Sequence, residues 1–327
     1  MDDGESAKGR RVLLADVGGT NVRFSLMHGT ETGPIEHRKV ADFPTFADAL
    51  ANFLEQHSSG RAVDAAVLDV AGPVENNRCV LTNSGWVIDG TELQKAFGIT
   101  AVRLINDFEA VAWSLPALEP DDLYAVGEQR GLEGAPMLAF GPGTGFGAAC
   151  LVFNGELPFA VGTEAGHATL PATSDREELV IRQLRRRFGH VSIERVLSGP
   201  GLENLYSALS EIDGASVPKR DAAQITQAAL EESCAISGAA LDMFCSLLGA
   251  VAGNLALTFC ARGGVFIAGG IVPQFAHRLA ESDFRKQFEN KARYESYLKN
   301  IPTRIVIRPD VSFLGLRAFF EKTFRLP

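Results

Sequence analysis

The sequence predicts an α/β protein made of two related halves, each built around a mixed β-sheet. Apolar strand-like runs are joined in pairs by tight turns and then alternate with helical patterns, and this order occurs twice along the chain. Two glycine-rich turns, at residues 18–21 and 143–145, each lie between two such runs. When the two turns are superposed, they share Leu-Ala on the N-terminal side and Gly-Thr at the same offset. The pattern indicates a duplicated domain.

The expected elements follow from apolar periodicity and from start and stop signals. Strand-like runs are expected at residues 11–17, 22–28, 65–71, 78–82, 102–106, 137–141, 147–153, 265–268 and 304–308. Helices are expected near residues 45–57, 91–97, 108–115, 175–188, 200–210, 221–260 in pieces, 275–297 and 313–324. The helix at 175–188 is the best marked, because Ser174 and Glu177 have capping-box spacing and Gly189 follows its end.

Composition and charge exclude several classes of protein. The 327 residues are 46% hydrophobic and 22% charged, as in an ordinary globular protein with room for two cores. The formal net charge of −9 argues against a surface for nucleic acid or for an anionic membrane. The most apolar stretch, residues 244–259, is short and contains Asn254, so we expect a buried helix there.

The five cysteines and the first residues bear on the compartment. The cysteines are scattered, with no pair at a zinc-binding or redox spacing. Residues 1–10 are polar and charged and contain no apolar signal-peptide region. We therefore expect a cytoplasmic protein with reduced thiols.

The first glycine-rich turn is a candidate phosphate site. Gly18, Gly19, Thr20 and Asn21 follow a strand that carries Asp16 near its end. Such a turn can point several backbone N–H groups at one anion, and a carboxylate beside it can hold Mg²⁺. The turn matches neither the P-loop pattern nor the dinucleotide fingerprint, since a strand follows it. A simple tight hairpin is the alternative for one turn alone.

The second turn and a third glycine-rich element extend the nucleotide site. Gly143, Thr144 and Gly145 form the second turn, and a pair of turns favours a polyphosphate ligand over two plain hairpins. Gly269 and Gly270 end an apolar run, where a base or ribose can lie against the backbone. For that third element alone, a close strand–helix turn is an equal alternative.

Asn106 and Asp107 follow the strand expected at residues 102–106, and the carboxyl end of a strand is where α/β proteins place ligands. Asp107 can accept a proton from an attacking hydroxyl, while Asn106 can donate to and accept from neighbouring hydroxyls. A capping role of Asp107 at a helix that begins near Phe108 is the alternative, and the two roles can coexist.

With these elements in order, the chain resembles the sugar-kinase branch of the hexokinase–actin–heat-shock-ATPase superfamily, and more closely the bacterial glucokinase family of the enterobacterial type. The matching stretches together span nearly the whole chain: residues 15–23, 105–108, 141–147, 164–167, 194–201 and 263–273. The resemblance implies a two-domain actin-like (ribonuclease H-like) ATPase fold with duplicated mixed-sheet domains and an interdomain cleft. It also implies ATP-dependent phosphorylation of D-glucose at its 6-hydroxyl, the first step of glycolysis.

The resemblance further implies domains, ligands and site residues. The small domain would comprise residues 1–117 and 309–327, and the large domain residues 118–308. Asp107 would be the catalytic base, Asp16 would organise Mg²⁺, and ATP would lie on the glycine-rich elements. A homodimer is also implied. The positions expected to contact glucose are Asn106, Asp107, Glu164, His167 and Glu194.

Glu164 and His167 also admit other interpretations. A metal site there would need a third ligand, and no nearby residue supplies one. The cysteine-rich zinc motif of the related repressor–kinase family is absent from the sequence. Ala165 replaces the first glycine of the family's Glu-Gly-Gly-His, a change that a turn tolerates. Residues 168–171 are less acidic and less aromatic than expected, which affects the expected discrimination among sugars. Thr82 and Asn83 are further candidates for the sugar pocket.

Three alternatives to a glucokinase remain open from the sequence. A kinase of another hexose, such as mannose, fructose or glucosamine, would use the same site. A sugar-responsive transcriptional regulator would need a basic helix-turn-helix, and the ten-residue leader cannot contain one. An actin-like or chaperone ATPase would need no sugar-binding residues, so Asn106 and Asp107 argue against it.

Overall fold

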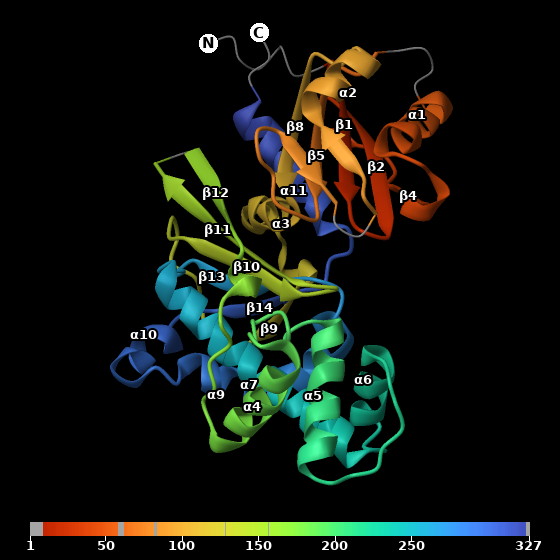
Figure 1. Ribbon diagram of the computed structural model, residues 1–327. Helices are drawn as coiled ribbons and strands as arrows, with labels where there is room; N and C mark the ends of the chain where they lie inside the picture. Colours follow the sequence, from red (N-terminus) through yellow and green to blue (C-terminus); the bar gives the residue numbers. More distant parts are fainter. Residues whose placement is uncertain (1–8, 58–61, 82–83, 128, 156, 325–327) are drawn as a thin grey trace. The chain divides into compact units, whose positions relative to one another are not determined.

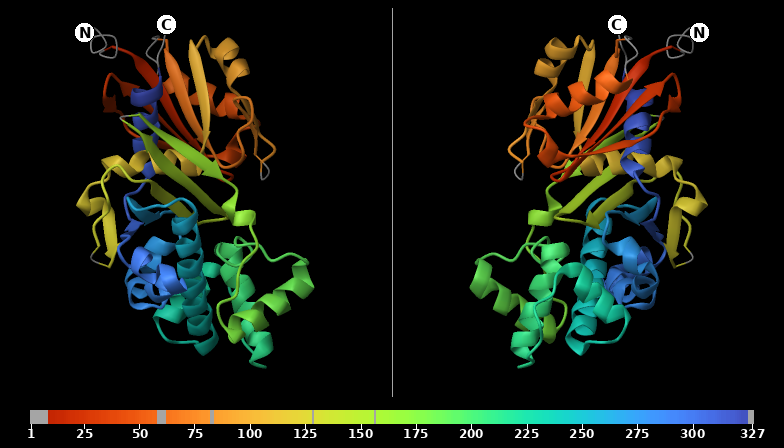
Figure 2. Two further views of the ribbon diagram at one scale, coloured as in Figure 1. Left: turned by 90° about the vertical axis from the view of Figure 1, so that its left-hand side faces the viewer. Right: turned by 90° about the vertical axis from the view of Figure 1, so that its right-hand side faces the viewer.

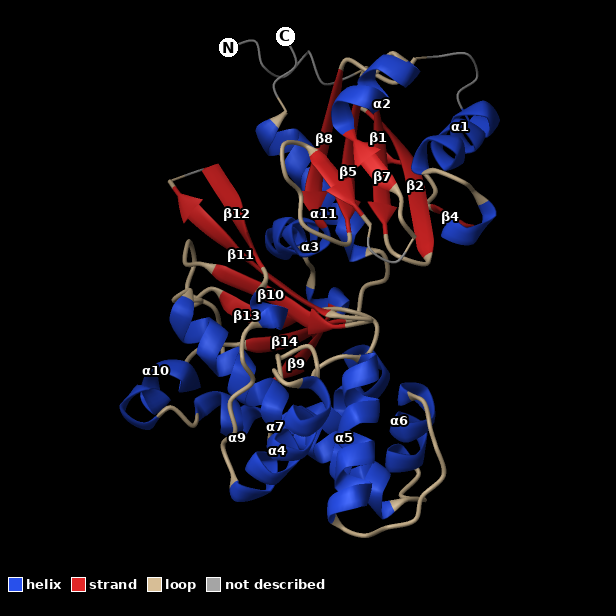
Figure 3. Ribbon diagram, viewed as in Figure 1, coloured by secondary structure: helices blue, strands red, loops and turns tan. Residues whose placement is uncertain are grey.

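The chain forms two compact units in the computed structural model, which describes residues 9–57, 62–81, 84–127, 129–155 and 157–324 (Figure 1). Unit 1 consists of Met1–Ala117 and Asp310–Pro327, and unit 2 is Leu118–Pro309. Each unit contains a six-stranded mixed sheet with helices (Figure 3). The predicted mixed α/β class is therefore confirmed.

The main sheet of unit 1 has the strand order β3-β2-β1-β5-β8, with β4 also paired to β2. β1 and β2 form an antiparallel hairpin, while β1, β5 and β8 are parallel. The bounds are Arg11–Val17 for β1, Asn21–His28 for β2, Glu31–Thr32 for β3, Glu36–Lys39 for β4, Ala65–Val70 for β5 and Ala101–Asn106 for β8. A separate pair joins β6, Arg78–Val80, to β7, Val87–Asp89.

Two pairs of helices cover the two faces of this sheet (Figure 2). Strand side chains alternate between faces, so Leu13 packs with α1 (Phe46–His57) and α2 (Gly90–Phe97), whereas Leu14 packs on the face of α3 (Asp107–Ser114) and α11 (Val311–Thr323). The helices α3 and α11 lie very close together, because a Cβ on Gly315 of α11 would come within 1.7 Å of the Ala110 carbonyl oxygen. This close packing fixes the start of α3, which carries Asp107.

Unit 2 repeats the strand arrangement of unit 1. Its sheet has the order β12-β11-β10-β13-β14-β9, in which β10 and β11 form an antiparallel hairpin and β10, β13 and β14 are parallel. This hairpin followed by parallel strands has the same arrangement as β2-β1-β5-β8 in unit 1. The topology of the two sheets therefore shows the duplication expected from the two turns. The bounds are Leu123–Val126 for β9, Met137–Pro142 for β10, Phe146–Asn154 for β11, Leu157–Thr163 for β12, Gly264–Ile267 for β13 and Thr303–Val306 for β14.

The helices of unit 2 form one hydrophobic core with the face of the sheet that carries Leu138 and Ile267. The α-helices of this unit are α4 (Asp175–Phe188), α5 (Gly199–Ile212), α6 (Ala222–Leu230), α7 (Ala235–Thr258), α8 (Ala276–Glu281), α9 (Phe284–Glu289) and α10 (Glu295–Lys299). Within the described residues, α7 alone is long and apolar enough to span a membrane, but 72% of its most apolar window is buried inside the fold. The predicted buried helix is thus part of the core.

Short single-turn helices fill several connections. They are Val40–Asp42, Leu115–Ala117, Pro120–Asp122, Ala165–His167, Val272–Phe275 and Ala292–Tyr294.

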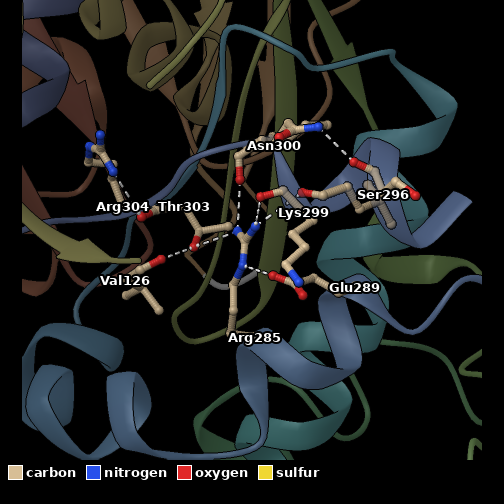
Figure 4. Close-up of polar contacts among 10 residues, drawn as sticks. Val126, Arg285, Glu289, Ser296, Lys299, Asn300, Thr303 and Arg304 are labelled. Atoms are coloured by element: carbon tan, nitrogen blue, oxygen red, sulfur yellow. Dashed lines mark hydrogen bonds and ion pairs between the residues drawn. The ribbon is translucent and has the colours of Figure 1, made fainter. Parts of the chain in front are cut away.

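One arginine ties together the last helices and strands of unit 2 (Figure 4). Arg285 of α9 forms an ion pair with Glu289 at 2.6 Å and donates to the carbonyl oxygen of Lys299, at the end of α10, at 3.0 Å. It also donates to Thr303 Oγ1 at 3.2 Å, and that hydroxyl donates to the Val126 carbonyl oxygen at 2.6 Å. A single guanidinium, with its several donors, therefore joins α9, α10, β14 and β9.

Several expectations about elements were wrong in detail. The helix expected at 275–297 is broken into α8, α9, α10 and single-turn helices. The edge strand β12 was missed because Pro158 and Gly162 interrupt its apolar run, and residues of that kind are tolerated at a sheet edge. The short strand β9 was also missed.

Candidate functional site

The first glycine-rich turn, in unit 1, presents unpaired backbone donors. The Gly18 N–H donates to the Asn21 carbonyl oxygen at 3.0 Å and closes the turn between β1 and β2. Among the described residues, no acceptor pairs with the N–H groups of Gly19 or Thr20. Thr20 and Asn21 are exposed. The arrangement leaves two adjacent amides available to an anion, as the sequence predicted for a phosphate cradle.

Asp16 lies next to last in β1, one residue before this turn, and belongs to a polar network. Its Oδ2 accepts from Arg23 Nη1 at 2.5 Å and from Ser312 Oγ, at the start of α11, at 3.2 Å. The Arg23 Nε also lies 3.4 Å from Asp310 Oδ1. Burial opposes the charge on Arg23, but the negative charges of Asp16 and Asp310 prevail and raise the pKa of Arg23. The carboxylate of Asp16 is thus held by two donors that come from β2 and α11.

A second carboxylate, Asp69 of β5, lies beside Asp16. The two residues are register partners in the parallel pair of β1 and β5, so their side chains lie on the same face of the sheet. Asp69 is fully buried, and within the described part of the chain no donor pairs with either of its side-chain oxygens. Burial, together with the negative charges of Asp16 and Asp107, raises the pKa of Asp69 well above its usual range.

Asp107 begins α3, immediately after the carboxyl end of β8. Its Oδ1 accepts from the Phe108 N–H at 2.9 Å. Burial and the nearby charge of Asp16 raise the pKa of Asp107 to about 7, although the Phe108 N–H and Asn106 favour its charged form. A carboxyl with this pKa near neutral pH can accept a proton from a hydroxyl.

Asn106 is the N-cap of α3, so the capping position expected for Asp107 is shifted by one residue. Its Oδ1 accepts from the Phe108 N–H at 3.0 Å, and its Nδ2 donates to the Gly72 carbonyl oxygen at 3.3 Å. The side chain is therefore held in a fixed orientation, with one amide hydrogen left for another acceptor.

The second glycine-rich turn, in unit 2, has the same character as the first. The Gly143 N–H donates to the Gly145 carbonyl oxygen at 2.8 Å, while the N–H groups of Thr144 and Gly145 have no acceptor among the described residues. The Gly143 carbonyl oxygen accepts from the N–H of Gly199, the first residue of α5, at 2.9 Å. Two free amides therefore lie beside the positive end of a 14-residue helix.

Gly269 and Gly270, at the end of β13, lie against this turn. A Cβ on Gly269 would come within 2.6 Å of the Pro142 carbonyl oxygen, and the residue has a φ of +92°. A Cβ on Gly270 would meet nothing within 4 Å. The backbone of unit 2 therefore brings together the second turn, the start of α5 and the glycine pair, which the sequence assigned to one nucleotide.

The three remaining candidates for sugar binding also meet within unit 2. Glu194 Oε2 accepts from the Phe146 N–H at 3.0 Å, and the Glu194 N–H donates to the Gly166 carbonyl oxygen at 2.9 Å. His167 Nε2 lies 3.8 Å from Glu164 Oε2, and both side chains are mostly exposed. Glu194 therefore lies between the second turn and the short helix Ala165–His167.

Sequence reasoning missed Asp69, Arg23, Asp310 and Ser312. Asp69 carried a usable signal, because a charged residue stands inside an otherwise apolar strand. Asp310 and Ser312 approach Asp16 only through the fold, since they belong to the last helix. Thr82 and Asn83 lie outside the described residues. In the part of the chain that the structure describes, no group of three or more His, Cys, Asp or Glu side chains is arranged to hold a metal ion.

A family model described as Glucokinase matches residues 13–323. The chain belongs to the glucokinase family. The glucokinase of Paramagnetospirillum magneticum is 41% identical over 309 residues, covering 93% of this chain and 96% of that relative. The resemblance found in the sequence is therefore confirmed, and the protein is an enzyme of this family.

Solved structures of the family agree with the fold. A glucokinase from an Antarctic psychrotroph superposes with a TM-score of 0.87 at 34% identity, covering 96% of this chain and 99% of that one. A glucokinase from Balamuthia mandrillaris, solved in complex with glucose, has a TM-score of 0.79 at 20% identity, with coverage of 96% and 94%. The second likeness supports the fold alone.

Proposed function

We propose that this chain transfers the γ-phosphoryl group of ATP to the 6-hydroxyl of D-glucose, with Asp107 as the base. Membership of the glucokinase family supports the reaction. The observation that carries the assignment of the base is the raised pKa of Asp107, about 7, at the carboxyl end of β8. A carboxylate whose pKa is raised to near neutrality removes a hydroxyl proton more readily than an ordinary one.

The phosphates of ATP are proposed to bind the free amides of the two turns. The donors are the N–H groups of Gly19 and Thr20 in unit 1 and of Thr144 and Gly145 in unit 2. Gly18, Asn21 and Gly143 shape these turns, and Gly269 and Gly270 leave room for the adenosine. Phosphoryl transfer depends mainly on positioning and on stabilisation of charge, which backbone amides supply at no cost in reorganisation.

Mg²⁺ is proposed to be held at Asp16. The donor set fits a hard cation, because Asp16 supplies carboxylate oxygen next to a phosphate cradle and the buried oxygens of Asp69 accept from no donor among the described residues. When bound, the ion would neutralise charge on the phosphates. Arg23 and Ser312 fix the orientation of the Asp16 carboxylate.

Glucose is proposed to be held by Asn106, Asp107, Glu164, His167 and Glu194. The fixed amide of Asn106 and the anchored carboxylate of Glu194 are preorganised acceptors and donors for hydroxyl groups. A site that hydrogen-bonds specific hydroxyls strongly rejects sugars that lack them. A kinase of another hexose is the second candidate, and it would use the same base.

The protein is further proposed to act in the cytoplasm, and to be a homodimer as the family resemblance implies. The scattered cysteines support the reducing compartment. The mass of the native protein, measured by light scattering, tests the dimer directly.

The test of the proposed function is ADP release from Mg²⁺·ATP across a panel of hexoses. Wild type is compared with Asp107→Asn and with Glu92→Gln, which alters an exposed carboxylate of the same unit. We expect turnover with glucose that falls by about 10²–10⁴-fold in Asp107→Asn only. Stronger activity on another hexose would show that this hexose is the substrate, and it would leave the assignment of Asp107 as the base intact. Glucose-independent hydrolysis that Asp107→Asn leaves unchanged would overturn the proposal.

A further inference from the structure

We propose that Asp69 is a second carboxylate for the divalent cation that Asp16 holds, either as a direct ligand or as an acceptor for the ion's water. The inference rests on the proposed function, because it concerns the metal of the same site. It adds a residue that the sequence motifs do not mark.

The placement of Asp69 points to a ligand. Asp69 and Asp16 are register partners on adjacent parallel strands, next to the ends of β5 and β1, on the face covered by α3 and α11. The turn that follows Asp16 carries the free amides of Gly19 and Thr20. A cation held between the two carboxylates would thus lie beside the groups proposed to bind phosphate.

The surroundings of Asp69 do not explain why a carboxyl group is there. Its side chain is fully buried, and among the described residues no donor pairs with either of its oxygens; its polar neighbour is the carboxyl group of Asp16. Nearly all buried polar side chains in folded proteins have partners, because an unpaired one is costly. Arg23 and Ser312, the donors next to this pair, hydrogen-bond to Asp16. The described part of the chain therefore supplies no hydrogen-bond donor to Asp69.

Unit 2 shows that the fold does not require carboxylates at this place. The equivalent register pair, on β10 and β13, is Phe140 and Ile267. Both of these side chains are fully buried in the hydrophobic core. The same hairpin and parallel strand thus accommodate two apolar side chains in one unit and two acids in the other, so the acids serve something other than packing.

The chemistry of the cluster points to a cation as the partner of Asp69. Asp16, Asp69 and Asp107 influence one another electrostatically, so a bound cation would favour the ionised form of Asp69 that burial disfavours. Among the described residues Arg23 acts on this group, and it is shared with Asp310. Oxygen ligands alone select a hard ion. Mg²⁺ in phosphoryl-transfer sites is usually held by one or two carboxylates together with phosphate oxygens and water, which this pair of acids can provide.

The test measures metal binding directly. Mn²⁺, observed by electron paramagnetic resonance in the presence of ADP, is titrated into wild type, Asp69→Asn, Asp69→Ser, Asp16→Asn and the exposed control Glu92→Gln. We expect the Mn²⁺ affinity to fall about 10–100-fold in both Asp69 variants and in Asp16→Asn, and to stay unchanged in the control. Thermal unfolding without metal or nucleotide should show that Asp69→Asn is at least as stable as wild type, since it removes a buried carboxyl without partners.

Each other outcome has a definite meaning. Loss of Mn²⁺ affinity in Asp16→Asn alone would overturn the role of Asp69 and leave the proposed function intact. Unchanged affinity in all variants, or no Mn²⁺ binding by wild type with ADP, would overturn the role of Asp69 together with the metal assignment of Asp16. A lower melting temperature of Asp69→Asn with unchanged Mn²⁺ affinity would make Asp69 a structural residue.

Discussion

The two units share a strand topology and use it for different chemistry. In unit 1, acidic residues stand at or just after the ends of the parallel strands: Asp16, Asp69 and Asp107. In unit 2, the pair equivalent to Asp16 and Asp69 is Phe140 and Ile267. Both halves of the duplicated scaffold thus present backbone amides at a glycine-rich turn, and unit 1 adds acids at these strand positions. Phosphoryl transfer needs both kinds of group.

The turns differ less than the strands that lead into them. In each turn the first glycine N–H closes the turn, and the next two N–H groups have no acceptor among the described residues. What changes is a residue of the strand that leads into the turn, which is Asp16, held by Arg23, in unit 1 and the core residue Phe140 in unit 2. The comparison predicts which substitutions remove activity and which remove stability.

Among the substitutions that test this comparison, the largest expected effect on turnover comes from removing the charge of Asp16 in unit 1. Asp16→Asn should lower kcat by about 10²–10³-fold, because it weakens a metal site worth several kcal/mol in the transition state. Steady-state kinetics at saturating glucose and ATP measure the effect. A kcat within the range of wild type would show that Asp16 has no part in the reaction.

The raised pKa of Asp107 predicts that stability falls with pH. An acid whose pKa is about 7 in the folded protein and 3.8 ordinarily is protonated more readily when folded. The contribution of Asp107 to the free energy of unfolding is therefore fully present below pH 4. It is lost as the pH rises to about 7, which lowers the free energy of unfolding by roughly 2–4 kcal/mol. Urea unfolding at several pH values should show that the free energy of unfolding falls less steeply with rising pH in Asp107→Asn than in wild type. Equal slopes for the two proteins would contradict the raised pKa.

Substitutions at two glycines of unit 2 should affect different properties, the stability of the fold in one case and the binding of ATP in the other. A Cβ on Gly141 would lie 1.9 Å from the Ala268 carbonyl oxygen, whereas a Cβ on Gly143 would meet nothing within 4 Å. Gly141→Ala should therefore destabilise the protein by about 1–3 kcal/mol or more.

The matched variant, Gly143→Ala, should unfold like wild type but have a higher KM for ATP, since its methyl group enters space proposed for phosphate. Differential scanning calorimetry and ATP titration measure the two properties. An unchanged KM for ATP in Gly143→Ala would exclude this turn from the nucleotide site.

The sequence was sufficient for the duplicated α/β fold, because the strand–turn–strand pattern is local and occurs twice. It also marked Asp16 and Asp107 as candidates, since both stand next to recognisable turns or strand ends. The partners of these acids could not be found in the same way. Asp310 and Ser312 reach Asp16 only because the last helix packs on the sheet of unit 1, and no local pattern encodes that contact.

Asp69 illustrates a different limit. Its position inside an apolar strand was visible, but whether a buried acid has a partner depends on three-dimensional contacts. The prediction of one helix at 275–297 was wrong, and the strand β12 was missed, for a local reason. Proline, glycine and short segments weaken the periodic signal.

The central claim is that Asp107 of unit 1 removes the proton of the sugar hydroxyl. The most direct test is the pH dependence of kcat/KM for glucose, which reports the ionisation of groups in the free enzyme. Wild type should show a limb that rises with pH and levels off above a pKa of about 7, the value of Asp107. Asp107→Asn should retain only residual activity without that limb. A wild-type profile that is flat between pH 5 and pH 8, or a rising limb that survives in Asp107→Asn, would contradict the assignment.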